Sequence, residues 1–252
     1  MLTIGLACAL LIGLTLGMLG GGGSILTVPV FVYVLGYDPK LAIAMSLPVV
    51  GATSFIGALR HWRAGNLHFQ SALLLGIAAM VGAFAGARAS VWLSGRSQLL
   101  LLGVLMLASS VMMLRDSFRS APVNDTRAGS APLPLLLAVG FAVGTLTGIV
   151  GIGGGFLIVP ALVLLARVPM QQAVGTSLAV ITLNSIAGFA GQRMIAEIPL
   201  GVVLSFTVVA VIGILAGTAL IRHVPARALK RAFSVLLMVI AALVLWQNHA
   251  RL

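Results

Sequence analysis

Long hydrophobic runs separated by short polar segments make up most of the sequence. They cover residues 2–36, 41–59, 67–92, 98–114, 133–166, 171–190, 199–221 and 229–247. Most runs reach the roughly 20 residues that a helix needs to cross a bilayer. The pattern therefore predicts an all-α polytopic membrane protein. The opening run has no basic residue before it, so we interpret it as part of the fold and not as a signal peptide.

One polar segment, residues 115–132, is rich in Ser, Asp, Asn and Pro and predicts an exposed linker. The segments on either side, 1–114 and 133–252, align without a gap when Pro29 is laid on Pro160, an offset of 131 residues. In this register Gly13, Gly17, Gly20, Gly22 and Gly23 meet Gly144, Gly148, Gly151, Gly153 and Gly154. Such a match predicts two copies of one membrane unit.

The first run of each copy is too long for one crossing and is interrupted by glycines. Because several neighbouring glycines weaken a helix by about 1 kcal/mol each, each run is expected to form two segments joined by an unwound turn. Whether these segments are re-entrant or cross fully, such a hairpin returns the chain to its starting side. Three further spanning helices then give each copy an odd number of net crossings, so the second copy is expected to be inverted.

The basic residues favour this inverted arrangement. It places ten Lys and Arg residues on one side and five on the other, whereas parallel copies give seven against eight. Since basic residues concentrate on the cytoplasmic side, the linker is predicted to be cytoplasmic and both termini periplasmic. The larger set is Arg60, Arg63, Arg115, Arg119, Arg127, Arg167, Arg222, Arg227, Lys230 and Arg231; the smaller is Lys40, Arg88, Arg96, Arg193 and Arg251.

The composition narrows the classes of function. The chain is 60% hydrophobic and 8% charged, with a net charge of +11 and a mean hydropathy of +1.18. Its basic residues flank hydrophobic runs, which indicates membrane orientation and not nucleic-acid binding. With four acidic residues and one cysteine, no catalytic residue, metal site or cofactor is expected. If transport is coupled to protons, His61, His68 or the substrate itself would have to carry them.

The glycine clusters are the first candidate site. Unwound backbone within a membrane is tolerated where protein or water surrounds it, and the N-terminus of a helix offers N–H groups to an anion. Two inverted copies would bring two such turns together. The predicted residues are Gly22, Gly23, Ser24, Gly153, Gly154 and Gly155. The alternative is that these glycines only allow close packing, which is the expected role of the Gly-x-x-x-Gly motifs at Gly13, Gly82, Gly144 and Gly213.

Polar residues on one helix face are the second candidate. Ser46 and Thr53 are seven residues apart, as are Ser177 and Asn184 in the repeat, and Thr176 lies beside them. Residues at this spacing share a helix face, and their hydroxyl and amide groups can bond the oxygens of a solute. The alternative is that they bond between helices or back to their own helix.

Two motifs resemble those of a known family. Residues 148–160, GIVGIGGGFLIVP, followed by 173–178, AVGTSL, look like the signature of the sulfite exporter TauE/SafE family, also called the toluene-sulfonate uptake permeases. Residues 17–29 with 42–47 look like a first copy. The resemblance implies a bacterial inner-membrane permease for small sulfur-containing or organic anions such as sulfite, sulfoacetate, sulfonates or thiosulfate. Met45 stands where the second copy has Thr176, which would make the two halves contribute unequally.

These observations predict a permease that works by alternating access, with the two halves moving around one anion site. The expected partners are a small anionic solute, membrane lipid and, as an open alternative, a second copy of the chain in a homodimer. A passive anion channel is the rival within transport. A membrane enzyme is disfavoured because its usual motifs are missing, and a scaffold is disfavoured because unwound helices cost stability.

Overall fold

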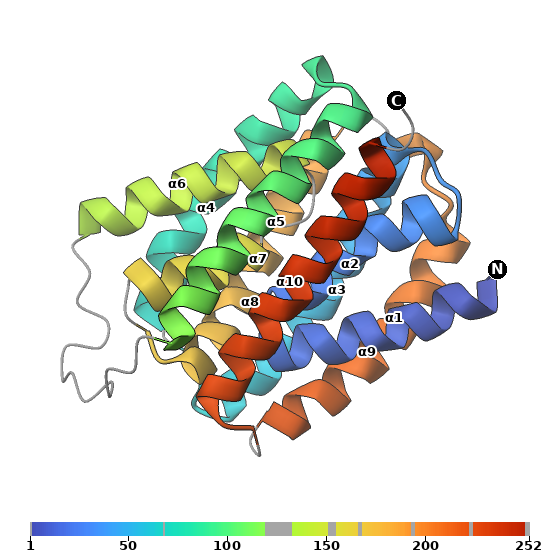
Figure 1. Ribbon diagram of the computed structural model, residues 1–252. Coiled ribbons are helices and arrows are strands. Elements are labelled where there is room, and N and C mark those ends of the chain that lie inside the picture. The colour runs from blue at the N-terminus through green and yellow to red at the C-terminus, as the bar shows by residue number, and fades with distance from the viewer. Residues whose placement is uncertain are drawn as a thin grey trace.

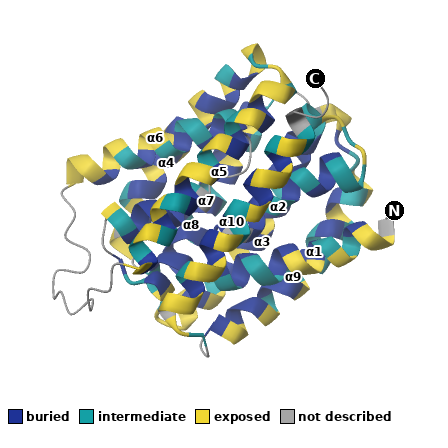
Figure 2. Cartoon of the chain, in the orientation of Figure 1, coloured by how far each residue is buried: buried dark blue, intermediate teal, exposed yellow. Residues whose placement is uncertain are grey.

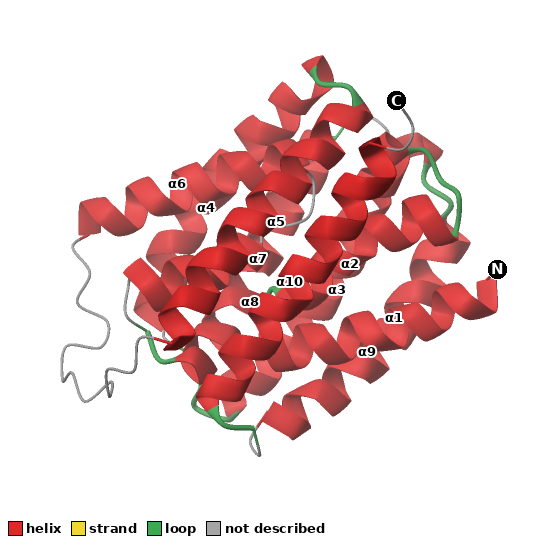
Figure 3. Ribbon diagram, viewed as in Figure 1, coloured by secondary structure: helices red, strands yellow, loops and turns green. Residues whose placement is uncertain are grey.

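The computed structural model describes residues 2–67, 69–118, 133–150, 155–165, 168–192, 195–221 and 224–249. All regular structure in these residues is helical (Figure 3). The α-helices are α1 (Leu2–Leu19), α2 (Gly22–Pro29), α3 (Pro39–Arg63), α4 (Phe69–Ala89), α5 (Gly95–Phe118), α6 (Leu133–Val150), α7 (Gly155–Pro160), α8 (Met170–Gly191), α9 (Leu200–Leu220) and α10 (Ala226–His249). Short π- or 3₁₀-helical segments are η1 (Val30–Val34), η2 (Ser90–Trp92), η3 (Ala161–Leu165) and η4 (Ile195–Glu197).

Seven of the described helices are long and apolar enough to cross a membrane, which confirms the predicted fold class. They are α3, α4 with η2, α5, α6, α8, α9 and α10.

The first hydrophobic run is divided into two helices at the glycines, as the sequence predicted. α1 ends at Leu19, and α2 begins at Gly22 and continues through η1 to Val34. At 1.5 Å per residue these 13 residues extend about 20 Å, which is shorter than a hydrocarbon core of about 30 Å. The α2–η1 segment is therefore too short to be a complete crossing.

The two copies repeat each other at the level of whole helices. α6, α8, α9 and α10 begin 131 residues after α1, α3, α4 and α5, respectively. This is the offset at which the sequence aligns with itself. The match extends to η3, which begins 131 residues after η1.

Two pairs of helices that correspond between the copies, α3 with α8 and α5 with α10, lie side by side and run antiparallel. Along α3 and α8, Gly51 faces Ser185, while Gly57 faces Leu178 further along α3 and nearer the start of α8. In the same way Asp116, near the end of α5, forms an ion pair with Lys230, near the start of α10. Figure 1 shows α5 and α10 next to each other along the front of the bundle.

Six of the helices form two groups of three, and each group contains helices from both copies. α1 packs on α9, and α9 on α3; in the matching group α6 packs on α4, and α4 on α8. Gly13 and Gly213 allow the close approach of α1 and α9, with Gly13 Cα 3.1 Å from the position of a Cβ on Gly213. The Gly82 and Gly144 motifs do the same for α4 and α6. Close packing by the Gly-x-x-x-Gly motifs is thus confirmed.

α3 and α8 are the most deeply buried of the spanning helices. Residues in their most hydrophobic windows are 72% and 67% buried, against 44% or less in the other spans. Figure 2 shows buried residues where helices meet and exposed residues on the outer faces, as expected for a surface in contact with lipid. α5 continues to Phe118, beyond the start predicted for the linker, because Asp116 and Ser117 bond to α10.

Candidate functional site

The turn between α1 and α2 is a close contact between the two copies. Gly20 has φ +71°, a left-handed conformation that glycine adopts readily. A Cβ on Gly20 would lie 3.0 Å from Val174 Cα and 2.5 Å from Ser177 Oγ, both on α8. The turn of the first copy therefore lies directly against the polar motif of the second, as convergence of the two would require.

The N-terminus of α2 has no side-chain cap. Its first backbone N–H groups have no acceptor within the helix, as at every helix start. Gly22 opens the helix, and Gly23 is buried because α2 packs there on α1, near Ile12 and Leu16. The Ser24 hydroxyl is fully buried and donates to the Gly21 carbonyl oxygen at 2.8 Å.

The second glycine turn is largely outside the described residues. Gly153 and Gly154 lie in the part of the chain that the structure does not describe. Gly155 is the first residue of α7. The predicted contribution of this turn stays a prediction.

The predicted hydroxyl residues on α3 and α8 are all buried, and three of them bond to their own helix. Ser46 donates to the Ile43 carbonyl at 2.8 Å, Thr53 to Val49 at 2.6 Å, and Ser177 to Val174 at 2.8 Å. These three hydroxyl groups thus donate to carbonyl oxygens of their own helix, which is the alternative role that the sequence left open for them. Each hydroxyl would have to rotate before it could donate to an anion. Thr176 is also fully buried.

Asn184 differs from these hydroxyl residues. It is 1% exposed, and neither Oδ1 nor Nδ2 has a hydrogen-bond partner among the described residues. Leaving an amide buried without a partner costs roughly 2 kcal/mol or more. Native proteins avoid this cost unless a water, an ion or a function accounts for it.

Two serines that the predicted set omits share this property. Ser54 on α3 and its counterpart Ser185 on α8 are at most 1% exposed, and within the described chain their Oγ atoms have no partner. Their burial and free oxygen atoms become visible only in the structure. We refer to Ser54, Asn184 and Ser185 as the crossing cluster, because they lie in α3 and α8 and Ser185 faces Gly51 where these two helices pack together.

The predicted residues therefore lie at two levels of α8. Ser177 contacts the first glycine turn, whereas Asn184 lies seven residues, about 10 Å, further along the helix. A small ion at one level would not contact the other.

His61 lies beside the first level. It is 2% exposed, its Nε2 is 3.5 Å from the Gly17 carbonyl oxygen, and its Cβ is 2.8 Å from the position of a Cβ on Gly175. Among the buried residues that the structure describes, His61 has the only ionisable side chain, and it lies next to the turn. Gln98, which the sequence did not indicate, donates to the Ile149 carbonyl at 3.0 Å, just before the second turn.

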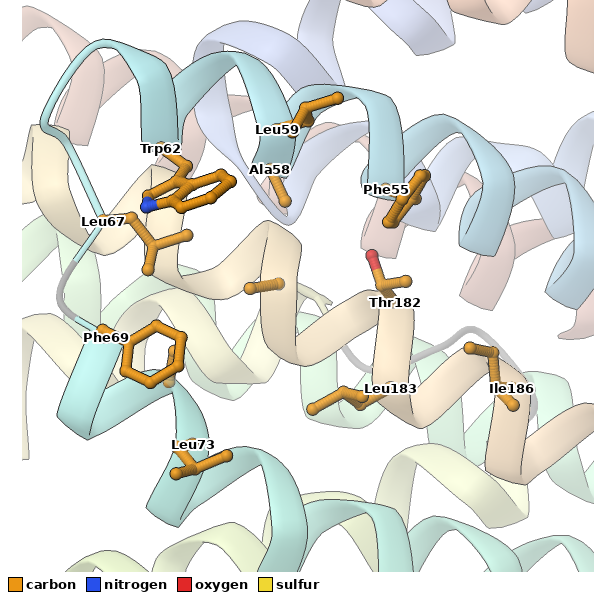
Figure 4. A pocket seen from close by; sticks show the side chains of 12 residues that line it. Phe55, Ala58, Leu59, Trp62, Leu67, Phe69, Leu73, Thr182, Leu183 and Ile186 are labelled. Atoms are coloured by element: carbon orange, nitrogen blue, oxygen red, sulfur yellow. The ribbon is translucent and has the colours of Figure 1, made fainter.

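Two hollows on the side of the molecule lie apart from the predicted site residues. They have volumes of about 530 Å³ and 340 Å³ and lie between α3 and α8, and α4 closes one end of the larger (Figure 4). Their linings are almost entirely apolar. Of the crossing cluster only Ser185 lines one of them, and none of the predicted site residues does.

Comparison with known proteins gives one family and several named relatives. The model of the family described as sulfite exporter TauE/SafE matches residues 5–244. A probable membrane transporter protein of Xylella fastidiosa (strain 9a5c) is 31% identical over 245 residues, which cover 96% of this chain and 94% of that protein. No solved structure matches the chain.

Two more distant relatives carry the same description. The probable membrane transporter protein MJ0441 of Methanocaldococcus jannaschii is 30% identical over 189 residues, 71% of this chain and 69% of that protein. YunE of Bacillus subtilis, also a probable membrane transporter protein, is 29% identical over 201 residues, 71% of this chain and 73% of that protein.

Proposed function

Because the chain belongs to the sulfite exporter TauE/SafE family, we propose that it is a permease that carries small sulfur-containing or organic anions across the bacterial inner membrane by alternating access. Membrane transport itself follows from the family and from the names of the relatives. The substrate class, the path and the mechanism are the proposal.

The observation that carries the proposal is the unpartnered amide of Asn184. It lies in α8, the helix that faces both the first glycine turn and α3. The Nδ2 group has two N–H donors, and a passing oxyanion would accept bonds that the amide lacks in the empty protein. A solute that satisfies the amide for a short time can be bound and released, as transport requires.

The electrostatics suit an anion better than a cation. Among the described residues, Asp38 caps the start of α3, Asp116 pairs with Lys230 near the end of α5, and Glu197 is exposed in η4 between α8 and α9, so all three acids lie near helix ends. The path would instead offer amide and hydroxyl hydrogens and the N-terminus of α2, all of which favour negative charge.

The arrangement of the helices supports an inverted repeat. Inversion places Arg115 and Lys230 on one side of the membrane, and parallel copies place them on opposite sides. The ion pair between Asp116 and Lys230, 2.7 Å long, fits the inverted arrangement. The moving units would be the mixed groups α1–α9–α3 and α6–α4–α8, because the contacts of the Gly-x-x-x-Gly motifs lie within each group.

The test is uptake into proteoliposomes of labelled sulfite, a sulfonate and a carboxylate. Asn184→Asp keeps the shape of the side chain and adds a negative charge, so we expect at least a tenfold loss of sulfite flux. Thr182→Val, two residues earlier in α8 on a hydroxyl that bonds to Leu178 at 2.8 Å, serves as the matched control and should keep most of the flux.

Kinetics separate the carrier from the channel. Saturable flux with counterflow supports alternating access, and flux that rises linearly without counterflow contradicts it. Full sulfite and sulfonate flux in the Asn184→Asp protein would overturn the site. If vesicles with the wild-type protein take up no more labelled sulfite or sulfonate than empty vesicles, the proposed substrate class is wrong.

A further inference from the structure

The two apolar hollows between α3 and α8 adjoin each other, and we call them together the lateral groove. They share Phe55, Thr182 and Ile186, and along α3 the lining runs from Leu47 to Trp62. At 1.5 Å per residue this is about 22 Å, longer than one leaflet's share of a hydrocarbon core about 30 Å thick. The groove therefore has the length of a lipid acyl chain.

The groove opens sideways, toward lipid. Phe55, Ile186 and Phe69 line it and are 56%, 58% and 68% exposed. The Thr182 hydroxyl, visible between α3 and α8 in Figure 4, donates to Leu178, whereas the Ser185 hydroxyl in the lining has no partner among the described residues. The rest of the lining is almost entirely apolar, which suits a hydrocarbon chain better than an anion.

One end of the groove is basic. Trp62, 62% exposed, lines that end with Leu67 and Phe69 (Figure 4). Arg63 follows the lining residue Leu59 by four positions, so it lies on the same face of α3 one turn further on. Arg60 and Arg63 are both exposed in the last turn of the helix.

We propose that this groove binds an anionic phospholipid, with an acyl chain between α3 and α8 and its phosphate at Arg60 and Arg63. Indole rings favour the interface between hydrocarbon and headgroups, which matches the position of Trp62. Arginines near the membrane surface attract anionic headgroups with about 1 kcal/mol each. On the predicted orientation this end faces the cytoplasmic leaflet, where anionic lipids concentrate.

The lipid would touch both moving groups. α3 belongs to one group and α8, with α4, to the other. A bound acyl chain would lie along the contact between the two groups of helices, and alternating access would have to change this contact. The binding site itself does not depend on transport, so its test is independent of the proposed function.

Quenching of Trp62 by brominated lipids tests the proposal. The chain has three tryptophans, so Trp92→Phe with Trp246→Phe leaves Trp62 as the reporter. Vesicles contain phosphatidylcholine with a small fraction of phosphatidylglycerol, and one lipid at a time carries brominated chains. We expect phosphatidylglycerol to quench Trp62 at roughly a twenty-fivefold lower mole fraction than phosphatidylcholine, about fivefold for each arginine.

Matched variants assign the effect to the groove. Arg60→Gln with Arg63→Gln should bring the two lipids to equal quenching, and Arg115→Gln with Arg227→Gln, exposed on α5 and α10, should leave the preference unchanged. A protein that keeps Trp246 in place of Trp62 reports on α10, outside the groove, where Trp246 is 69% exposed. It should show no comparable preference.

Three outcomes would overturn the proposal. Equal quenching of Trp62 by both lipids shows ordinary lipid contact only. If Trp62 is still quenched preferentially by phosphatidylglycerol in the Arg60→Gln, Arg63→Gln protein, these arginines do not bind the headgroup. Absence of quenching by either lipid, together with a dimer in analytical ultracentrifugation, shows that a second copy of the chain covers the groove.

Discussion

At the scale of single residues, glycine and asparagine matter here for different physical reasons. Gly20 combines a positive φ with the close approach of α8, so it is required by backbone conformation and by space. Asn184 is expensive where it lies, because its amide is buried without a partner in the described chain. The first residue stabilises the fold, and the second costs stability that only a ligand or water could restore.

Gly20→Ala and Gly36→Ala form a matched pair. Both glycines have positive φ, 71° and 76°, but a Cβ on Gly36 would meet nothing within 4 Å. Gly36→Ala should lower the free energy of unfolding by about 1 kcal/mol, the cost of the left-handed conformation. Gly20→Ala should lower it by roughly 1–3 kcal/mol more, because the methyl group also displaces α8. Denaturation in mixed micelles measures both, and equal losses would show that the contact with α8 is unimportant.

At the scale of helices, packing depends on glycines that allow two backbones to approach. A Cβ on Gly13 would overlap the carbonyl oxygen of Ala210 on α9. Without a hydrophobic force between helices in lipid, such close contacts provide the association. The sequence indicated which residues are small, and the structure shows that each motif joins helices from different copies.

Gly13→Ala should therefore weaken the pair α1 and α9. We expect a loss of about 1–3 kcal/mol, the usual cost of overpacking. Gly201→Ala lies in the first turn of α9 with open space around it and should be neutral or stabilising by up to about 1 kcal/mol, since alanine is the better helix former. The measurement is the thermal unfolding midpoint in detergent, and a smaller loss at Gly13 than at Gly201 would refute the packing role.

At the scale of the molecule, contacts sort the helix ends into two sets. Gly95 faces Pro39, which joins the starts of α5 and α3. Gly175, near the start of α8, faces the Asn66 carbonyl in the segment after α3. These two contacts place helix ends on the same sides as the two sets of basic residues in the inverted arrangement.

Cysteine labelling in intact cells checks the orientation. In a Cys8→Ser background, Ser94→Cys should react with a membrane-impermeant maleimide, because Ser94 is exposed at the end predicted to be periplasmic. Ala64→Cys, exposed at the opposite end, should react only after the membrane is made permeable. The reverse pattern would mean that the chain is inserted the other way round.

The sequence by itself determined the membrane class, the repeat and the break at the glycines, because hydrophobic runs, an internal match and missing side chains are local properties. It also placed the candidate residues on shared helix faces. Only the tertiary structure decided what those faces meet: the Ser46, Thr53 and Ser177 hydroxyls bond to their own helices, and Asn184 is left without a partner among the described residues. Which groups are satisfied depends on how helices distant in sequence pack, and no local pattern contains that information.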